Sequence, residues 1–263
     1  MKNTTPATPA PAATMMLLRD GSQGIETFMV VRNAGIEFMG GAMVFPGGRV
    51  DPADHDSALQ AHVRDGHLYE PSDLALRIAG IRETFEETGV LLARPKGQRD
   101  FVSVDQLERL RETYAEALIR GDVSMLEFAK AESLEWAADV LVKFAHWITP
   151  EIRPKRFDTH FYLAPAPIDH IALHDGHESV DSVWTTTQQA FEDMRSGHRT
   201  IVFPTQCNLA KLGESSTVKE ALSTAKASKI VTILPEFKEG QRVPLPTDAG
   251  YKHQEIISPK IKK

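Results

Sequence analysis

The fold of this chain is decided by the stretch LALRIAGIRETFEETGV, residues 74–90. At about 100° per residue on a helix, its large apolar residues form one narrow stripe: Leu74, Ile78, Ile81 and Phe85. Glu86 and Glu87 follow Glu83 by three and four residues, so the three carboxylates project together from the opposite side of the helix. The stretch predicts a helix that packs on a core and carries an acidic patch.

Both ends of this helix are marked in the sequence. Ser72 or Asp73 can cap the N-terminus after Pro71, and Gly89 suits the left-handed conformation that ends a helix. The carboxylates therefore lie near the C-terminal end, where they oppose the helix dipole and repel one another by roughly a few tenths of a kcal/mol per pair. Helix propensity alone does not favour this arrangement.

The acidic patch has two interpretations. Most charge runs on surface helices are solvated faces. Here the nearest counter-charge, Arg82, precedes the acids at a helical angle well away from their centre, so we expect the helix itself to leave them unneutralised. A divalent cation such as Mg²⁺ or Mn²⁺ would neutralise them, because these ions prefer carboxylate oxygens and water as ligands.

Residues 82–90, RETFEETGV, resemble the second half of the Nudix box, the R-E-x-x-E-E-x-G core of the Nudix hydrolases. The first half departs from the usual pattern. Residues 45–48, FPGG, resemble the glycine turn that enters the box, but residues 49–72 make the spacing longer than usual. We interpret residues 49–72 as an insertion within the box.

The resemblance implies roles for the motif residues. Glu83 and Glu87 are the expected direct metal ligands, Glu86 a ligand or a water-positioning base, and the carbonyl of Gly47 or Gly48 a completing ligand. Arg82, Gly48 and Gly89 have structural roles in the motif. The glutamate that often pairs with the box arginine is missing, and its substitute is one of three residues: Asp51, Asp54 or Asp73. Glu178 is the candidate for a further general base, against the alternative of a polar surface loop.

Strand-like and helical segments alternate irregularly along the chain, which predicts a mixed α/β sandwich. We expect a hairpin from residues 14–18 and 27–32, and further strands at residues 43–45, 90–93, 140–148, 157–164, 179–185 and 230–234. Helices are expected at residues 187–196 and 215–227, with two or three more in an accessory segment, residues 103–140. The resemblance implies a Nudix-type α/β/α sandwich with a mixed sheet.

Composition predicts one soluble domain. The chain has 263 residues, 41% of them hydrophobic and 25% charged, which is enough for a substantial core. We expect a disordered leader at residues 1–13, the Nudix domain at residues 14–240 and a loosely ordered tail at residues 241–263. The apolar run at residues 15–18 is far shorter than the roughly 20 residues of a spanning helix, so we expect neither a membrane span nor a signal peptide.

Net charge and cysteine content indicate which binding partners and which cellular compartment to expect. A net charge of −6 argues against a nucleic-acid binder, because affinity for a phosphate backbone needs a basic face. Because Cys207 is the single cysteine, the chain cannot form an internal disulfide, which is typical of proteins of the reducing cytoplasm, the default compartment. We expect Cys207 to be a small buried hydrophobic residue. The accessory segment is suited to shape a substrate pocket or to form a subunit contact, as in a homodimer.

The motif order is similar to the Nudix subgroup typified by nucleoside diphosphate-linked moiety X motif 19. After the box and the helical segment come residues 146–150, HWITP, and residues 156–159, RFDT. This resemblance implies hydrolysis of coenzyme A or acyl-coenzyme A to 4′-phosphopantetheine, or its acyl form, and adenosine 3′,5′-bisphosphate. The alternatives are an ADP-ribose or NADH pyrophosphatase and a Nudix-fold protein that binds a nucleotide without cleaving it.

The sequence marks the basic side chains that could bind the substrate phosphates less clearly than it marks the metal ligands. Arg32 fits an arginine position in a coenzyme A signature of other Nudix pyrophosphatases. Arg153 and Arg156 belong to a basic cluster that either binds substrate phosphates or is ordinary surface charge. Three histidines, His146, His160 and His170, are expected to be structural or solvent-facing rather than ligands.

Overall fold

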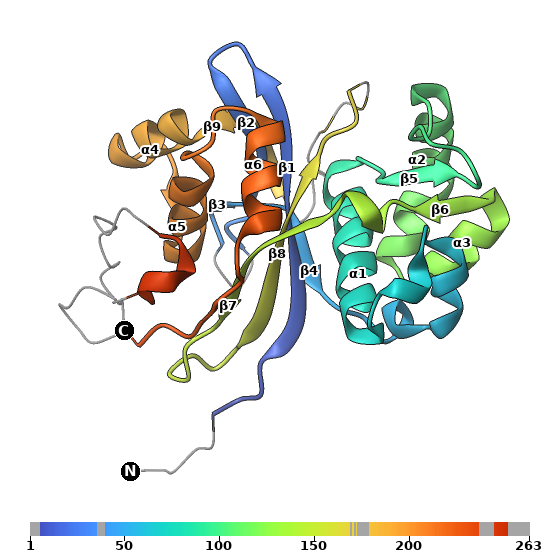
Figure 1. Ribbon diagram of the computed structural model, residues 1–263, viewed down its shortest axis with the longest axis horizontal. Coiled ribbons are helices and arrows are strands. Elements are labelled where there is room, and N and C mark those ends of the chain that lie inside the picture. The colour runs from blue at the N-terminus through green and yellow to red at the C-terminus, as the bar shows by residue number, and fades with distance from the viewer. Residues whose placement is uncertain are drawn as a thin grey trace.

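In the computed structural model, which describes residues 6–35, 40–168, 170, 172, 179–236 and 245–251, a mixed β-sheet separates two groups of helices (Figure 1). Nine strands of the described residues form this sheet in the order β10-β3-β2-β1-β8-β7-β11, with β4 paired to β1 and β9 paired to β2. The strands are β1 Ala10–Gly21, β2 Gly24–Arg32, β3 Ala42–Val44, β4 Gly47–Arg49, β7 Val142–Ile148, β8 Phe157–Pro165, β9 Ser179–Thr186, β10 Thr200–Ile201 and β11 Thr232–Ile233.

The two faces of the sheet support two separate cores. Side chains of β1 alternate between them, because Met15 and Leu17 face one core and Met16 and Leu18 face the other. Helix α1 Pro71–Thr88 covers the first face, and helices α2 Val104–Ile119 and α3 Met125–Glu132 extend the same core on the far side of α1. Helices α4 Thr187–Arg195, α5 Phe203–Leu212 and α6 Val218–Ala227 cover the second. This confirms the expected α/β/α sandwich with a mixed sheet.

Helix α1 forms as its periodicity predicts. The four residues of the apolar stripe are all buried, with Ile78 and Ile81 at 0% exposure. Pro71 occupies the first turn and Gly89, at φ 68°, is the left-handed C-cap. The N-cap is Glu70 rather than Ser72 or Asp73, because Pro71 begins the helix earlier than expected.

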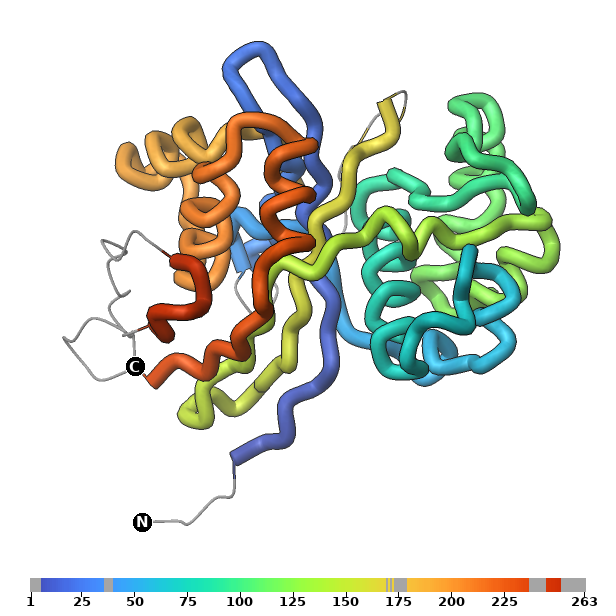
Figure 2. The backbone as a smooth tube through the Cα atoms, viewed as in Figure 1, coloured from blue at the N-terminus to red at the C-terminus, as the bar shows by residue number. Residues whose placement is uncertain are grey.

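The remaining faces of α1 are also covered. Three short 3-10 turns, η1 Pro52–His55, η2 Ser57–His62 and η3 Gly66–Leu68, fill the sequence before α1. Figure 2 shows these turns and the accessory helices on the side of α1 that faces away from the sheet. A two-stranded sheet, β5 Ala93–Pro95 with β6 Leu134–Trp136, joins this layer. Consequently α1 lies between the sheet and the accessory layer, and its acidic side is not an open solvated face.

Several expected boundaries differ from the structure. Strand β1 starts at Ala10, within the expected leader, because β4 and β8 pair with residues 10–14 and bury Ala12 and Ala13. The expected turn at Pro46 continues into a strand, β4, that pairs with β1. The expected strand at residues 90–93 begins only at Ala93. These segments owe their conformation to partners that are distant in sequence.

Other differences concern the C-terminal part of the chain. Helix α5 was not expected, and it buries Cys207, whose thiol pKa is raised by burial to about 12. Part of the expected loose tail packs on the core, because Leu245, Ala249 and Tyr251 are buried. Tyr251 accepts a hydrogen bond of 2.9 Å from the indole of Trp147. The other expected helices and strands are present, with η4 Ala138–Val140 and η5 Thr247–Ala249 as additional short turns.

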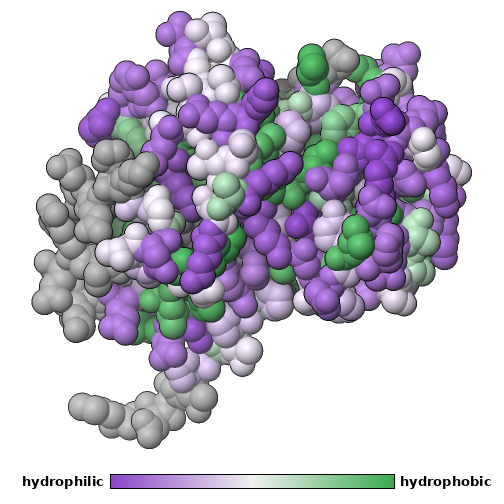
Figure 3. Space-filling model, viewed as in Figure 1, coloured by the Kyte–Doolittle hydropathy of each residue, from purple (hydrophilic) through white to green (hydrophobic). Residues whose placement is uncertain are grey.

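The surface is largely hydrophilic in the view of Figure 3, with small separate apolar areas. Large exposed apolar side chains come from different elements: Leu68, Ile119, Ile152, Ile168, Val180 and Leu234. Such scattered residues are normal on a soluble surface. Among the described residues, no helix is long and apolar enough to cross a membrane.

Candidate active site

The second half of α1 lies against strand β4, and the backbone of β4 fixes two glutamates. The amide of Gly47 donates a hydrogen bond of 2.9 Å to Oε2 of Glu87. The carboxylate of Glu83 lies against Gly48. A Cβ atom added to Gly48 would be only 2.4 Å from the Glu83 carboxylate. Gly47 also has a φ of 148°, which strongly favours glycine. The two glycines therefore bring the strand within contact distance of the acidic side of the helix.

Arg82 is the centre of the charge network. Its Nη1 donates to Oε1 of Glu83 at 2.9 Å and to Oε2 of Glu86 at 3.2 Å. Its Nη2 donates to Oδ2 of Asp54 at 3.0 Å and to the carbonyl of Arg49 at 2.8 Å. The expectation that the helix leaves its acids unneutralised was wrong, because the long arginine side chain reaches them even though its Cα lies off their centre.

The network identifies the partner of Arg82 among the three candidates. Asp54 accepts hydrogen bonds from both Nε and Nη2 of Arg82, and it is 2% exposed. In contrast, Oδ2 of Asp51 lies 3.8 Å from Nη2 of Arg82. Burial raises the pKa of Asp54, and the hydrogen bonds from Arg82 oppose that shift. Asp73 is engaged elsewhere, since it pairs with Arg77 and Lys143.

Glu86 has an unusual environment for a carboxylate. Its Oε2 accepts from Arg82, but its Oε1 is buried and has no hydrogen-bond partner within the described part of the chain. Burial raises the pKa of Glu86 to about 7, against the lowering effect of Arg82. Because a buried polar oxygen is normally paired, this atom calls for a cation or a proton. Glu83 and Glu87 lie against β4, and Glu86 is linked to Glu83 through Arg82. Carboxylate oxygens of the kind that a hard divalent cation prefers therefore line one side of α1.

Comparison with known proteins places this chain in a family. A family model of the NUDT19 Nudix domain matches residues 59–212, more than half of the 263-residue chain. This chain belongs to the NUDT19 Nudix family. The RETFEETG motif on α1 is thus its Nudix helix, and the chain is an enzyme of the Nudix hydrolase type.

The relatives that this chain matches include proteins named Acyl-coenzyme A diphosphatase NUDT19. The protein of Xenopus laevis is 23% identical over 278 residues, which cover 89% of this chain and 73% of that protein. The protein of Homo sapiens is 27% identical over 235 residues, which cover 73% of this chain and 59% of that protein. Among solved structures, a NUDIX hydrolase from Alicyclobacillus acidocaldarius superposes with a TM-score of 0.68 at 27% identity, covering 85% of this chain and 99% of that chain.

The other predicted residues of this Nudix protein are scattered. Arg32 ends β2, and Arg153 is exposed in the connection between β7 and β8. Arg156 is buried and donates to the carbonyls of Thr149 and Ala7, at 2.9 and 2.8 Å, which favours a structural role over substrate binding. Glu178 lies outside the described residues.

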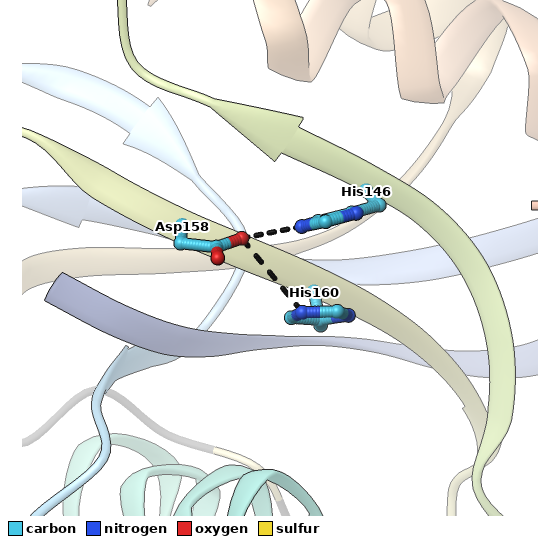
Figure 4. A group of neighbouring side chains, drawn as sticks. All are labelled: His146, Asp158 and His160. Atoms are coloured by element: carbon cyan, nitrogen blue, oxygen red, sulfur yellow. Dashed lines mark hydrogen bonds and ion pairs between the residues drawn. The ribbon is translucent and has the colours of Figure 1, made fainter. Parts of the chain in front are cut away.

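A second polar cluster lies on the β7–β8 hairpin, from His146, Asp158 and His160 (Figure 4). Asp158 and His160 are two residues apart on β8, and His146 pairs with His160 across the strands, so all three share one face. Nε2 of His146 contacts Oδ1 of Asp158, and Nε2 of His160 lies 3.8 Å from the same oxygen. Burial, together with the neighbouring His146, lowers the pKa of His160 to about 4.

Sequence reasoning missed this cluster because it treated each histidine separately. The available signal was the spacing of two residues between Asp158 and His160, which places both on one face of a strand. The position of His146 opposite them depends on the hairpin register, which includes an irregularity between Lys143 and Ala145. His170 is buried, as a structural residue would be, with Nε2 3.0 Å from the carbonyl of Val102.

Proposed function

We propose that this protein is a metal-dependent diphosphatase that hydrolyses coenzyme A or acyl-coenzyme A. The products are 4′-phosphopantetheine, or its acyl form, and adenosine 3′,5′-bisphosphate. One observation carries the proposal: on the Nudix helix, Glu83 and Glu87 lie against β4, and Oε1 of the neighbouring Glu86 is buried without a partner among the described residues. The names of the Xenopus and human relatives support the choice of substrate.

In this proposal Glu83 and Glu87 are the direct metal ligands, with the backbone of Gly47 close by, and Glu86 is a further ligand or the base that positions the attacking water. A bound Mg²⁺ or Mn²⁺ would offset the negative charge of the diphosphate and make water a better nucleophile. Arg82 holds the carboxylates of Glu83 and Glu86 in position. Burial raises the pKa of Glu86 in the metal-free protein to about 7, and its unpartnered Oε1 is the atom that would accept a proton from the attacking water.

The diphosphate, rather than the thioester, is the bond cleaved in this proposal. A hard cation held by carboxylates binds anionic phosphate oxygens more strongly than the neutral carbonyl oxygen of a thioester. The 3′-phosphate of coenzyme A needs a further cation, for which Arg32 and Arg153 are candidates. Dephospho-coenzyme A, which lacks this phosphate, is therefore expected to be a poorer substrate. We also propose a cytoplasmic location, supported by the single buried cysteine.

The test is a substrate panel with product analysis by mass spectrometry, in the presence of Mg²⁺ or Mn²⁺. Coenzyme A, acyl-coenzyme A, dephospho-coenzyme A, ADP-ribose and NADH are compared at equal concentration. The proposal expects 4′-phosphopantetheine, or its acyl form with the thioester intact, as the leading product. A free thiol released from acyl-coenzyme A with an intact diphosphate would instead indicate thioesterase chemistry.

Two other outcomes define the alternatives. Preferential cleavage of ADP-ribose or NADH would move the enzyme to another Nudix substrate class while keeping the metal ligands. Tight binding of a nucleotide in calorimetry, with no product under any metal, would indicate a binding protein. The three glutamates favour the enzyme, because simple recognition of a nucleotide does not require them.

A further inference from the structure

The cluster of His146, Asp158 and His160 is separate from the glutamates of the Nudix helix. One ligand atom from each residue, two imidazole nitrogens and one carboxylate oxygen, lies within 4.8 Å of the other two. Their side chains are 16%, 36% and 26% exposed, in chain order, so the atoms are sheltered but accessible to an ion. Two imidazoles with one carboxylate are a common three-residue ligand set for Zn²⁺ and other divalent transition metals, with a position left for water.

The second nitrogen of His146 supports this interpretation. Its Nδ1 lies 2.8 Å from the hydroxyl of Thr232 on β11, which is paired with β7 at this position. A metal-binding histidine usually directs its other ring nitrogen to an oxygen, which fixes the orientation of the ring. Thr232 therefore holds Nε2 of His146 toward Asp158.

The present ring geometry sets a requirement for metal binding. The two rings are stacked, with centroids 4.0 Å apart and planes 16° from parallel. An ion bound by both Nε2 atoms must lie near both ring planes, so at least one ring has to turn on binding. The terminal torsion of a histidine side chain has a broad energy profile, and His160 has no bond to Thr232 to restrain it, so His160 is the ring expected to turn.

The register of the sheet places the cluster on the same face as the Nudix helix. His146 is opposite His160, His160 is opposite Ala13, and Ala13 is opposite Gly48, against which Glu83 lies. Two strand spacings separate β8 from β4, so the backbones of His160 and Gly48 are roughly 10 Å apart. The glutamates and the histidine cluster are thus neighbouring sites with different ligand chemistry.

We propose that His146, Asp158 and His160 bind one divalent transition-metal ion of the Zn²⁺ type, oriented by Thr232, beside the glutamates that prefer Mg²⁺ or Mn²⁺. Imidazole nitrogen favours Zn²⁺, Co²⁺ and Ni²⁺ over Mg²⁺, whereas three carboxylates favour the harder ions. The proposal of this site can be tested whether or not the protein is a diphosphatase, because the experiment measures metal binding directly.

The test is a calorimetric titration of Zn²⁺ into the full chain, without a polyhistidine tag and freed of metal by a chelator. We expect one tight equivalent that excess Mg²⁺ does not displace. His146→Ala and His160→Ala should each weaken this equivalent at least tenfold, while His198→Ala, at an exposed histidine, should not change it. Thr232→Val should weaken it by roughly tenfold through loss of the orienting hydroxyl. Bound Co²⁺ should give a visible absorption spectrum with nitrogen ligands, lost in His160→Ala.

Controls make the outcome decisive. Circular dichroism and the melting temperature in chelator identify any variant that fails to fold, and Thr232→Val provides a conservative change at an exposed position. The double variant Glu83→Gln with Glu87→Gln should keep the Zn²⁺ equivalent. The proposal is overturned if the unmodified chain has no tight Zn²⁺ equivalent, if a folded His160→Ala keeps it, or if it depends on the glutamates instead.

Discussion

At the residue scale, Glu86 and Glu87 are adjacent in sequence and have different surroundings. Glu87 is 4% exposed and accepts a hydrogen bond from the backbone of Gly47. Glu86 presents one buried oxygen without a partner among the described residues, and its pKa is raised to about 7 by burial. A carboxylate that is held as an acceptor suits a ligand, whereas one that titrates near neutrality suits proton transfer.

Glu87→Gln removes one negative charge with almost no change in shape. The amide oxygen of glutamine can still accept from Gly47, so the fold should remain. We expect kcat for the diphosphate substrate to fall by on the order of 100-fold or more, because a metal ligand is lost. Steady-state kinetics measure this, with the melting temperature as the control for folding. Near-normal turnover would exclude Glu87 as a ligand.

Glu86→Gln tests the raised pKa. In the folded protein the pKa of Glu86 is above the value of 4.5 in the unfolded chain, so the folded state binds more protons between these pH values. Its contribution to stability is therefore favourable at low pH and is lost as the pH rises through about 7. In chelator at pH 8, Glu86→Gln should be more stable than the unmodified chain by about 1–3 kcal/mol. Urea unfolding at pH 5 and pH 8 measures this, and equal stability of the two proteins at both pH values would contradict it.

At the element scale, α1 is stabilised by burial on both the sheet side and the accessory side. Phe85 is 1% exposed, and the centroid of its ring lies 5.8 Å from the ring centroid of Phe128 on α3. We expect Phe85→Ala to cost roughly 3–5 kcal/mol of unfolding free energy, because it leaves a cavity between α1 and the accessory helices. Denaturant unfolding gives the value. Phe101→Ala, at a partly buried ring on the edge of the same core, should cost less.

A buried charge pair joins the inserted 3-10 segment to α1. Asp54 on η1 is buried and receives two nitrogens of Arg82, while Asp51 is largely exposed. Asp54→Asn should cost about 2–3 kcal/mol, less than a fully broken buried pair because Arg82 keeps Glu83 and Glu86. It should also lower activity, since Arg82 would shift relative to the glutamates. Thermal unfolding and kinetics measure both effects, with Asp100→Asn at an exposed site as the matched control.

At the scale of the whole molecule, the active site joins segments that fold together only in the complete sandwich. Mg²⁺ bound to the folded state and not to the unfolded chain must raise the melting temperature by mass action. We expect a rise with Mg²⁺ concentration in the unmodified chain and almost none in the variant Glu83→Gln with Glu87→Gln. Differential scanning fluorimetry over a Mg²⁺ series tests this. Equal shifts in both proteins would place the bound Mg²⁺ elsewhere.

The sequence by itself determined the features that depend on neighbouring residues. Helical spacing predicted the buried stripe of α1 and the shared side of its glutamates, and Gly89 predicted the end of the helix. The hairpin of β1 and β2 followed from a short polar turn between two apolar runs. These features could be predicted because a helix or a hairpin brings together residues that are close in the chain.

Only the tertiary structure decided which distant residues meet. The pairing of Arg82 with Asp54, the contact of β4 with the glutamates, and the row from His146 to Gly48 all depend on strand order and register. The same holds for Ala12 and Ala13, which composition assigned to a leader and which β4 and β8 bury. Local spacing contains no information about these contacts, because they form only when the two layers of helices close on the sheet and fix which faces are buried.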